Sequence, residues 1–196
     1  MVGTRRGDTA PFSEDALTRS EAPAANVKGA ISDLQSIRSL GCDGEFDLWK
    51  IATRGQASQY AAGLRSPDGR FTGNLRTRHT YEVLMRFSKL PQGGFDRIGR
   101  YPRLRWEGLC PTLRAGTGSD RGSYQSVRPV HPEADRVITV REAARLQGFP
   151  DRHRFHPTIW HSFRMIGNSV SPFMSAHVLG RVAEHMPWLQ MAEAAE

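Results

Sequence analysis

The chain has 196 residues, 38% hydrophobic and 24% charged, which suits one ordinary domain or two small ones and excludes a fully disordered chain. Its 27 basic residues, nearly all arginine, outnumber 20 acidic ones and give a net charge of +7, which favours an anionic partner, although a lysine-poor genome would also enrich arginine. With no apolar run of about 18 residues, no secretory leader and two cysteines, we expect a reduced, cytoplasmic protein.

The first part of the chain predicts little regular structure. Residues 1–27 hold little that could form a core and are expected to be a flexible tail or the remnant of a linker. Order is predicted to begin with a short helical turn at residues 27–34. Residues 41–78 are rich in turn signals and predict loops, with turns at residues 66–69 and 73–74.

The middle of the chain predicts one helix and a small, irregular β-containing domain. The helix is expected over residues 80–90, where apolar residues recur at helical spacing and Pro91 follows. Its apolar residues that share a face are Tyr81, Leu84 and Met85. Between residues 95 and 128, glycines recur, and short strands are expected to alternate with turns.

The last third is the most regular part. Residues 139–142 form a capping box that predicts a helix, and Gly148 stands where a left-handed C-cap is expected. A second helix is predicted from Ser171 as N-cap and Pro172 as first helical residue, until Pro187 ends it. A tight turn is expected at residues 167–169, between the two helices. The apolar face of the second helix comprises Phe173, Met174, Val178, Leu179, Val182 and Met186.

Three features could be read as catalytic or ligand sites, and none is persuasive. His153, His156 and His161 are clustered, but no carboxylate or cysteine completes a metal site, so no metal is expected. Residues 116–122 faintly resemble a nucleotide-binding glycine loop, without its lysine or its strand-to-helix setting, and a flexible loop is the better interpretation. Cys110 is best interpreted as a small residue packed before a proline.

The basic stretch from residue 97 to 128 is more informative. It contains seven arginines against two acidic residues, Glu107 and Asp120, with aromatic residues between the arginines. Arginine and aromatic side chains on glycine-rich loops can hold phosphates and reach base edges. The stretch therefore favours nucleic-acid binding over the alternative, a solvated loop whose aromatic residues belong to the core.

Four segments of the chain are informative together: residues 30–34, 111–113, 141–151 and 167–172. They resemble four segments of the DNA (cytosine-5)-methyltransferases and occur in the same order as in that family. Residues 141–151 resemble motif IX, and residues 167–172 resemble motif X. Upstream, residues 30–34 resemble the segment after motif VIII. Residues 111–113 resemble the Thr-Leu element that closes the target recognition domain. Each segment alone would be weak, but together they make a specific match.

The resemblance implies the C-terminal portion of an α/β, Rossmann-like methyltransferase: a small α+β target recognition domain and a final helix that returns to the Rossmann-like domain. In that family the large domain binds S-adenosylmethionine, and the target cytosine is flipped out of double-stranded DNA. The implied parts are a tail at 1–27, the recognition domain at 28–137, the motif IX helix at 138–151, the motif X turn and C-terminal helix at 152–187, and a tail at 188–196.

The resemblance also implies roles for individual residues. The positions that match the cofactor side are Asn168, Ser169 and Val170. In the alternative interpretation, residues 167 and 168 serve only to make the turn. The positions that match structural motif IX are Arg141, Arg145, Gln147, Phe149 and Pro150. The positions expected near DNA are Arg103, Arg105, Thr112, Arg114, Arg121 and Tyr124.

The sequence also departs from the family pattern. It has no Pro-Cys dipeptide, which carries the family's catalytic cysteine, no Glu-Asn-Val, no Gln-x-Arg-x-Arg of motif VIII, and no glycine-rich first motif. No catalytic residue is therefore assigned. We expect a bacterial or phage protein that reads DNA and forms part of an S-adenosylmethionine pocket, completed by a separate N-terminal methyltransferase subunit or half. The alternatives are an inactive gene fragment and a stand-alone DNA-binding module.

Overall fold

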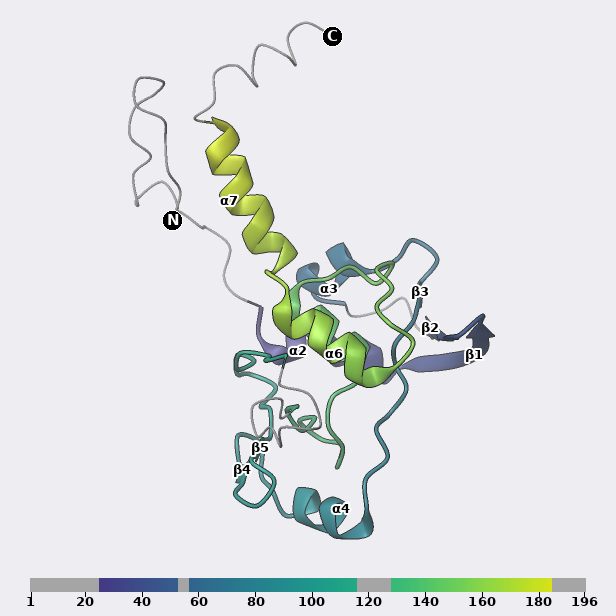
Figure 1. The fold of residues 1–196 in the computed structure, drawn as a ribbon, viewed down its shortest axis with the longest axis vertical. Coiled ribbons are helices and arrows are strands. Elements are labelled where there is room, and N and C mark those ends of the chain that lie inside the picture. The colour runs from purple at the N-terminus through teal and green to yellow at the C-terminus, as the bar shows by residue number, and fades with distance from the viewer. Residues whose placement is uncertain (1–24, 53–56, 116–127, 185–196) are drawn as a thin grey trace, which may run out of the picture. The chain divides into compact units, whose positions relative to one another are not determined.

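The computed structural model describes residues 25–52, 57–115 and 128–184 (Figure 1). Its internal contacts divide the chain into two compact units, one of which is Ala24–Ser169. The other contains, among the described residues, those from Val170 onward. Within the described part of the chain, no helix is long and apolar enough to cross a membrane.

The first unit begins with a short helix, α2 (Val27–Ile31), followed by a single 3-10 turn, η1 (Ser32–Gln35). The helix forms here because the Asn26 side chain accepts a hydrogen bond from the Gly29 backbone N–H at 2.8 Å, which caps its N-terminus. Ile31 and Leu34 are buried. The predicted helical turn at residues 27–34 is thus confirmed.

A three-stranded antiparallel sheet follows, with strand order β1-β2-β3. Its strands are β1 (Ile37–Asp43), β2 (Phe46–Ile51) and β3 (Arg70–Phe71). Gly44, between β1 and β2, has a φ of 60°, a conformation that glycine adopts without strain. The prediction of loops over residues 41–78 was therefore wrong for this hairpin.

Four more short elements follow in the middle of the unit, two helices and the two strands of a small second sheet. The helix α3 (Gln59–Leu64) was not predicted, and β4 (Phe95–Asp96) pairs antiparallel with β5 (Tyr101–Pro102). The helix α4 (Tyr81–Ser88) confirms the prediction over residues 80–90. Its predicted apolar face is exposed, however, and Phe87 is the residue that is buried.

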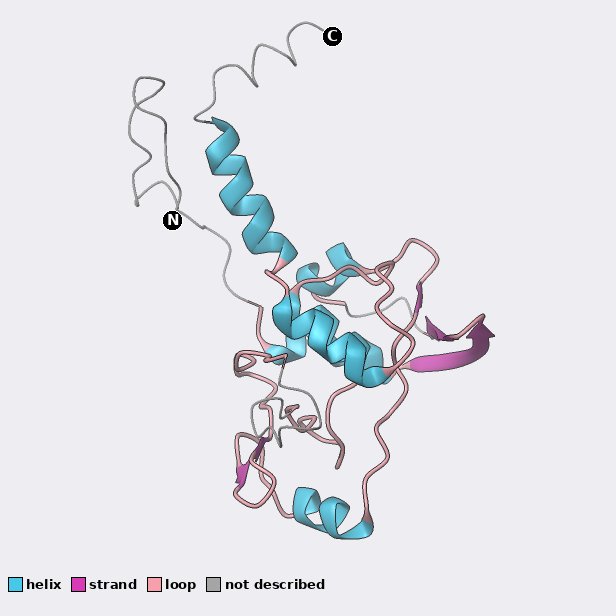
Figure 2. Ribbon diagram, in the orientation of Figure 1, coloured by secondary structure: helices cyan, strands magenta, loops and turns pink. Residues whose placement is uncertain are grey.

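The helix α5 (Val140–Gln147) confirms the predicted capping box, because Thr139 and Glu142 hydrogen-bond each other's backbone N–H groups. Gly148 takes the left-handed C-cap conformation with φ of 92°, also as predicted. Much of the rest of the first unit is loop (Figure 2). The main core is formed where α5 packs against α2 and against the helix α6 (Ile159–Asn168).

The helix α6 corrects one prediction. Gly167 and Asn168 were expected in a tight turn, but they are the last residues of α6, and the turn begins at Ser169. In the second unit, α7 (Pro172–Glu184) begins at the predicted proline. The predicted end of this helix lies outside the described residues.

Candidate functional site

The motif IX residue Arg145 lies entirely within the protein. Its Nε and Nη2 atoms donate to the two carboxylate oxygens of Asp151 at 2.6 and 2.7 Å, and its Nη1 donates to the Ala30 carbonyl at 3.2 Å. Burial opposes the charged form, but hydrogen bonding to Asp151 and the charge of Asp33 outweigh it and raise the pKa of Arg145. Arg145 therefore ties α5 to α2 and to the segment that follows α5.

Arg141 forms a second buried link. Its guanidinium donates to the backbone carbonyls of Thr72, Pro150 and His153 at 3.0, 3.1 and 2.7 Å. Burial lowers the pKa of Arg141 to about 10, which leaves the side chain charged at neutral pH. Arg141 thus fixes the loop after β3 against the loop after α5.

The remaining motif IX positions flank these arginines. The Phe149 ring contacts the Phe155 ring edge-on, with centroids 5.1 Å apart, and the Pro150 carbonyl accepts one of the Arg141 hydrogen bonds. The Gln147 side-chain amide donates to the Ser169 carbonyl at 3.0 Å. This last contact joins the motif IX helix directly to the first residue of the motif X turn.

The three positions expected on the cofactor side differ in their environment. Asn168 is exposed at the end of α6, so its amide can both donate and accept hydrogen bonds. The Ser169 hydroxyl donates to the Ile166 carbonyl at 2.7 Å, which holds the turn. Val170 is 60% exposed.

Of the positions expected near DNA, Arg103 is buried. Its guanidinium donates to the Leu90 carbonyl at 2.9 Å and to the Ala134 carbonyl at 3.3 Å, and it forms an ion pair with Asp135. These contacts join the loop after α4 to the loop before α5. They favour a structural role for Arg103 over a contact with DNA.

The other described positions of that set are exposed: Arg105, Thr112 and Arg114. Cys110 and Leu113 pack against the main core, so residues 110–114 are held on the protein while Thr112 and Arg114 remain exposed. Arg121 and Tyr124 lie outside the described residues. Among the described positions expected near DNA, two arginines and a threonine are therefore accessible to a ligand.

Two of the three features that the sequence offered as other kinds of site, Cys110 and the histidine cluster, are not supported by the geometry. Burial raises the pKa of Cys110 to about 12, which opposes formation of a thiolate. The His156 and His161 rings are in contact at a tilt of 46°, with centroids 4.5 Å apart. Within the described ranges, no group of three or more histidine, cysteine, aspartate or glutamate residues could hold a metal ion. Residues 116–122 lie outside these ranges.

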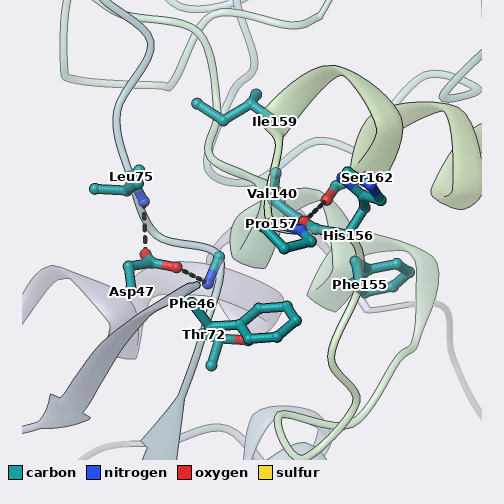
Figure 3. Close-up of a pocket in the computed structure, with 11 residues that line it drawn as sticks. Phe46, Asp47, Thr72, Leu75, Val140, Phe155, His156, Pro157, Ile159 and Ser162 are labelled. Atoms are coloured by element: carbon teal, nitrogen blue, oxygen red, sulfur yellow. Dashed lines mark hydrogen bonds between the residues drawn. The ribbon is translucent and has the colours of Figure 1, made fainter. Parts of the chain in front are cut away.

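A cavity beside the main core is too small for a cofactor (Figure 3). It has a volume of about 10 Å³, and its lining includes Phe46, Val140, Phe155 and Ile159. Next to it, the Asp47 carboxylate accepts hydrogen bonds from the backbone N–H groups of Gly73, Asn74 and Leu75 at 2.7 to 3.0 Å. Asp47 thus holds the loop after β3 in place and serves the fold.

Sequence reasoning named His161 and Asn168 on α6 but did not single out Trp160 or Arg164. The Arg128 guanidinium lies 4.3 Å from the centroid of the Phe163 ring and donates to the Thr77 hydroxyl at 3.1 Å. Trp160 and Arg164 are exposed one turn apart, with the guanidinium 5.5 Å from the ring centroid. The spacing of four residues between this tryptophan and arginine was the available signal.

Comparison with known proteins identifies relatives of most of the chain. The family model for C-5 cytosine-specific DNA methylase matches residues 1–184. The type II methyltransferase M.XorII of Xanthomonas oryzae pv. oryzae is 39% identical over 196 residues, which cover 93% of this chain and 45% of that protein. DNA (cytosine-5)-methyltransferase 1A of Oryza sativa is 46% identical over 90 residues, which cover 42% of this chain and 5% of that protein.

A solved structure is similar as well. A DNA modification methyltransferase encoded within a prophage (E. coli) superposes with a TM-score of 0.72 at 32% sequence identity. The match covers 90% of this chain and 51% of that one. The chain therefore spans about half the length of M.XorII and of the prophage enzyme. The small mixed α/β fold is that of the C-terminal portion of such a methyltransferase.

Proposed function

The chain belongs to the C-5 cytosine-specific DNA methylase family, and from that premise we propose that it recognises DNA sequence and forms part of an S-adenosylmethionine pocket. The complete enzyme would methylate C5 of cytosine in double-stranded DNA, in a restriction–modification system of a bacterium or phage. This chain would act in the cytoplasm, without a metal.

One observation carries the proposal. The Gln147 amide holds the Ser169 carbonyl at 3.0 Å, so the helix that organises the small domain also fixes the turn expected on the cofactor side. The same unit exposes Thr112 and Arg114, which match DNA-side positions of the family. DNA reading and two of the three cofactor-side positions, Asn168 and Ser169, would thus be carried by one unit.

The proposed division of chemistry follows from the residues present. When bound, S-adenosylmethionine supplies the methyl group. The residues that we propose to contact it are Asn168 with its amide, Ser169 with its backbone turn and Val170 with its apolar side chain. The nucleophilic thiolate that attacks C6 of cytosine would come from outside this chain, because neither Cys42 nor Cys110 follows a proline.

The partner that we propose is an N-terminal methyltransferase subunit or half. The helix α7 exposes Phe173, Met174 and Leu179, which are 51%, 61% and 66% exposed. Large apolar side chains gathered on one element are typical of an interaction surface. A Rossmann-like partner that covers them would complete both the fold and the cofactor pocket.

A stand-alone DNA-binding module remains the second candidate. It is favoured by one observation, that the first unit has a main core built from residues of its own elements. The neighbouring gene discriminates between the two candidates. An upstream reading frame that ends in Gln-x-Arg-x-Arg favours the divided enzyme, and its absence favours the module or a gene fragment.

DNA reading is tested by replacing Arg105, Thr112 and Arg114 singly with alanine and titrating duplex DNA at several salt concentrations. Loss of a phosphate contact should weaken binding to all sequences and reduce the salt slope by about 0.9. Loss of a base contact should cost about 1–3 kcal/mol at one base pair and spare non-specific binding. Full retention of affinity and selectivity by all three variants would contradict the proposal.

A further inference from the structure

Gly167 lies where two backbone segments come unusually close. A Cβ atom at this position would stand 2.3 Å from the Ala115 amide nitrogen and 2.5 Å from the Arg114 carbonyl carbon. Both are backbone atoms, so no side-chain rotation could make room. Gly167 is not among the described residues with positive φ, and glycine within a helix is less favourable than alanine by about 1 kcal/mol. The close approach is therefore what requires a glycine here.

The segment that rests on Gly167 is anchored on both sides of its exposed residues. Cys110 and Leu113 pack against the main core, while Thr112 and Arg114 are exposed. Ala115 then meets the end of α6 at Gly167. Residues 110–115 are thus held by the packing of Cys110 and Leu113 and by the backbone contact at Gly167, while Thr112 and Arg114 remain exposed to solvent.

The helix α6 also contacts the chain at residue 128. The Arg128 guanidinium covers the Phe163 ring, and Phe163 precedes Gly167 by four residues. Residues four apart share one helix face and are separated by about 6 Å along the axis. The helix α6 therefore anchors the chain at both residue 115 and residue 128, on one face.

The cofactor-side turn begins at the same end of α6. Asn168 follows Gly167 directly, and the Ser169 carbonyl is held by Gln147 at 3.0 Å. Because Gln147 fixes this end of the helix, α6 cannot give way easily when the loop is pushed. A side chain at position 167 would displace residues 114 and 115 instead.

We propose that Gly167 is a positioning residue for DNA specificity: it seats residues 110–115 on α6 and thereby sets where Thr112 and Arg114 meet double-stranded DNA. The role in DNA specificity rests on the proposed function, whereas the contact that holds residues 110–115 on α6 does not depend on it. Substitution at Gly167 should relax sequence selectivity more than it lowers overall affinity, because phosphate contacts tolerate displacement better than contacts with base edges.

The first measurement needs no DNA. Backbone order parameters are determined by NMR for the 196-residue chain, for Gly167→Ala, and for Gly63→Ala as a matched control. Gly63 is also helical, but a Cβ there would meet nothing within 4 Å. We expect amides 112–115 to fall from about 0.85 to below about 0.6 in Gly167→Ala alone. Rigid amides in a folded Gly167→Ala variant would overturn the seating.

A second variant covers the case in which Gly167→Ala does not fold. Insertion of Gly-Gly between Leu113 and Arg114 shifts the loop off Gly167 without altering α6, and lengthening a loop costs little stability. The same fall in order parameters is expected at residues 112–115. If these amides stay rigid in the insertion variant, the contact with Gly167 does not seat the loop.

The second measurement uses a pool of randomised DNA duplexes, from which each protein selects bound molecules for sequencing. The wild-type chain and Gly63→Ala should select one sequence pattern, and Gly167→Ala should select a weaker pattern with bound yield reduced less than threefold. An unchanged pattern with a mobile loop would overturn the role in specificity. If the wild-type chain selects no pattern, the proposed function fails, while the order parameters still decide the seating.

Discussion

At the scale of single residues, the arginines divide into two groups that no count of charge could separate. Arg141 and Arg145 are fully buried and hold the fold together, whereas Arg105 and Arg114 are exposed. The carboxylate of Asp33 lies 3.4 Å from the Arg145 guanidinium, although 112 residues separate them in the chain. Such long-range pairs cannot be seen in a single sequence.

Arg145→Met should destabilise the first unit by about 3–5 kcal/mol, because it leaves the Asp151 and Asp33 carboxylates buried without their shared partner. Urea unfolding followed by circular dichroism measures this change. The exposed Arg114→Met serves as the control and should stay within about 0.5 kcal/mol of the wild type. Equal stabilities of the two variants would contradict the role of Arg145.

Asn168→Ala should weaken binding of S-adenosylmethionine in the reconstituted enzyme while leaving DNA affinity largely intact. A hydrogen bond to a charged ligand contributes about 1.5–3 kcal/mol, which corresponds to about 10- to 150-fold in affinity. Isothermal titration with the cofactor gives the change. If a folded Asn168→Ala variant binds the cofactor as the wild type does, the residue only ends α6.

At the scale of elements, the last third was predictable because local signals and tertiary packing agree there. The capping box at Thr139, the left-handed Gly148 and the start of α7 at Pro172 each follow from backbone chemistry within a few residues. Gly44 was visible as a turn signal too. The hairpin around it was missed because β1 is almost entirely exposed and has no alternation of apolar and polar residues.

The end of α6 was misread for a different reason. Gly167 and Asn168 are typical turn residues, and only the backbone of Arg114 and Ala115, about fifty residues earlier in sequence, explains a glycine inside the helix. The candidate site could likewise be predicted only in part. Motif positions could be named from the sequence, but the burial of Arg103 and the Gln147–Ser169 contact required the fold.

The capping box of α5 should make stability depend on pH. Although burial alone would raise it, the pKa of Glu142 lies below its ordinary value of 4.5, chiefly because Arg136 hydrogen-bonds the carboxylate. Its contribution is therefore fully present above about pH 4.5 and is lost as the pH falls through the lowered value. Urea unfolding from pH 7 to pH 3 should show a smaller acid loss for Glu142→Gln than for the wild type.

Glu142→Gln should also be less stable than the wild type at pH 7, because glutamine keeps the hydrogen-bonding shape but loses the charge pairing with Arg136 at 2.8 Å. The acid loss that remains in the variant should come partly from His131, since burial lowers the pKa of that imidazole below 6.5. Parallel pH profiles for the variant and the wild type would contradict the assignment to Glu142.

At the scale of the whole molecule, the chain combines a unit with its own core and a helix with no buried residue. The main core draws on α2, α5 and α6, which all belong to the first unit. The chain also spans 45% of M.XorII and 51% of the prophage enzyme. The main core favours a first unit that folds by itself.

Removal of residues 170–196 should therefore leave the thermal midpoint of the first unit within about 4 °C of the full-length value, since a change of 1 kcal/mol shifts such a midpoint by about 2–4 °C. Circular dichroism melting of the two proteins gives the comparison. A fall much larger than this would mean that the C-terminal helix stabilises the first unit.

The central claim is that this chain supplies DNA reading and part of the cofactor pocket but no nucleophile. It is tested most directly by incubating DNA with labelled S-adenosylmethionine and the chain, alone and after co-production with the polypeptide encoded upstream. We expect unlabelled DNA from the chain alone and labelled cytosine from the pair. Labelled cytosine from the chain alone, and above all label that survives replacement of both Cys42 and Cys110, would contradict the account.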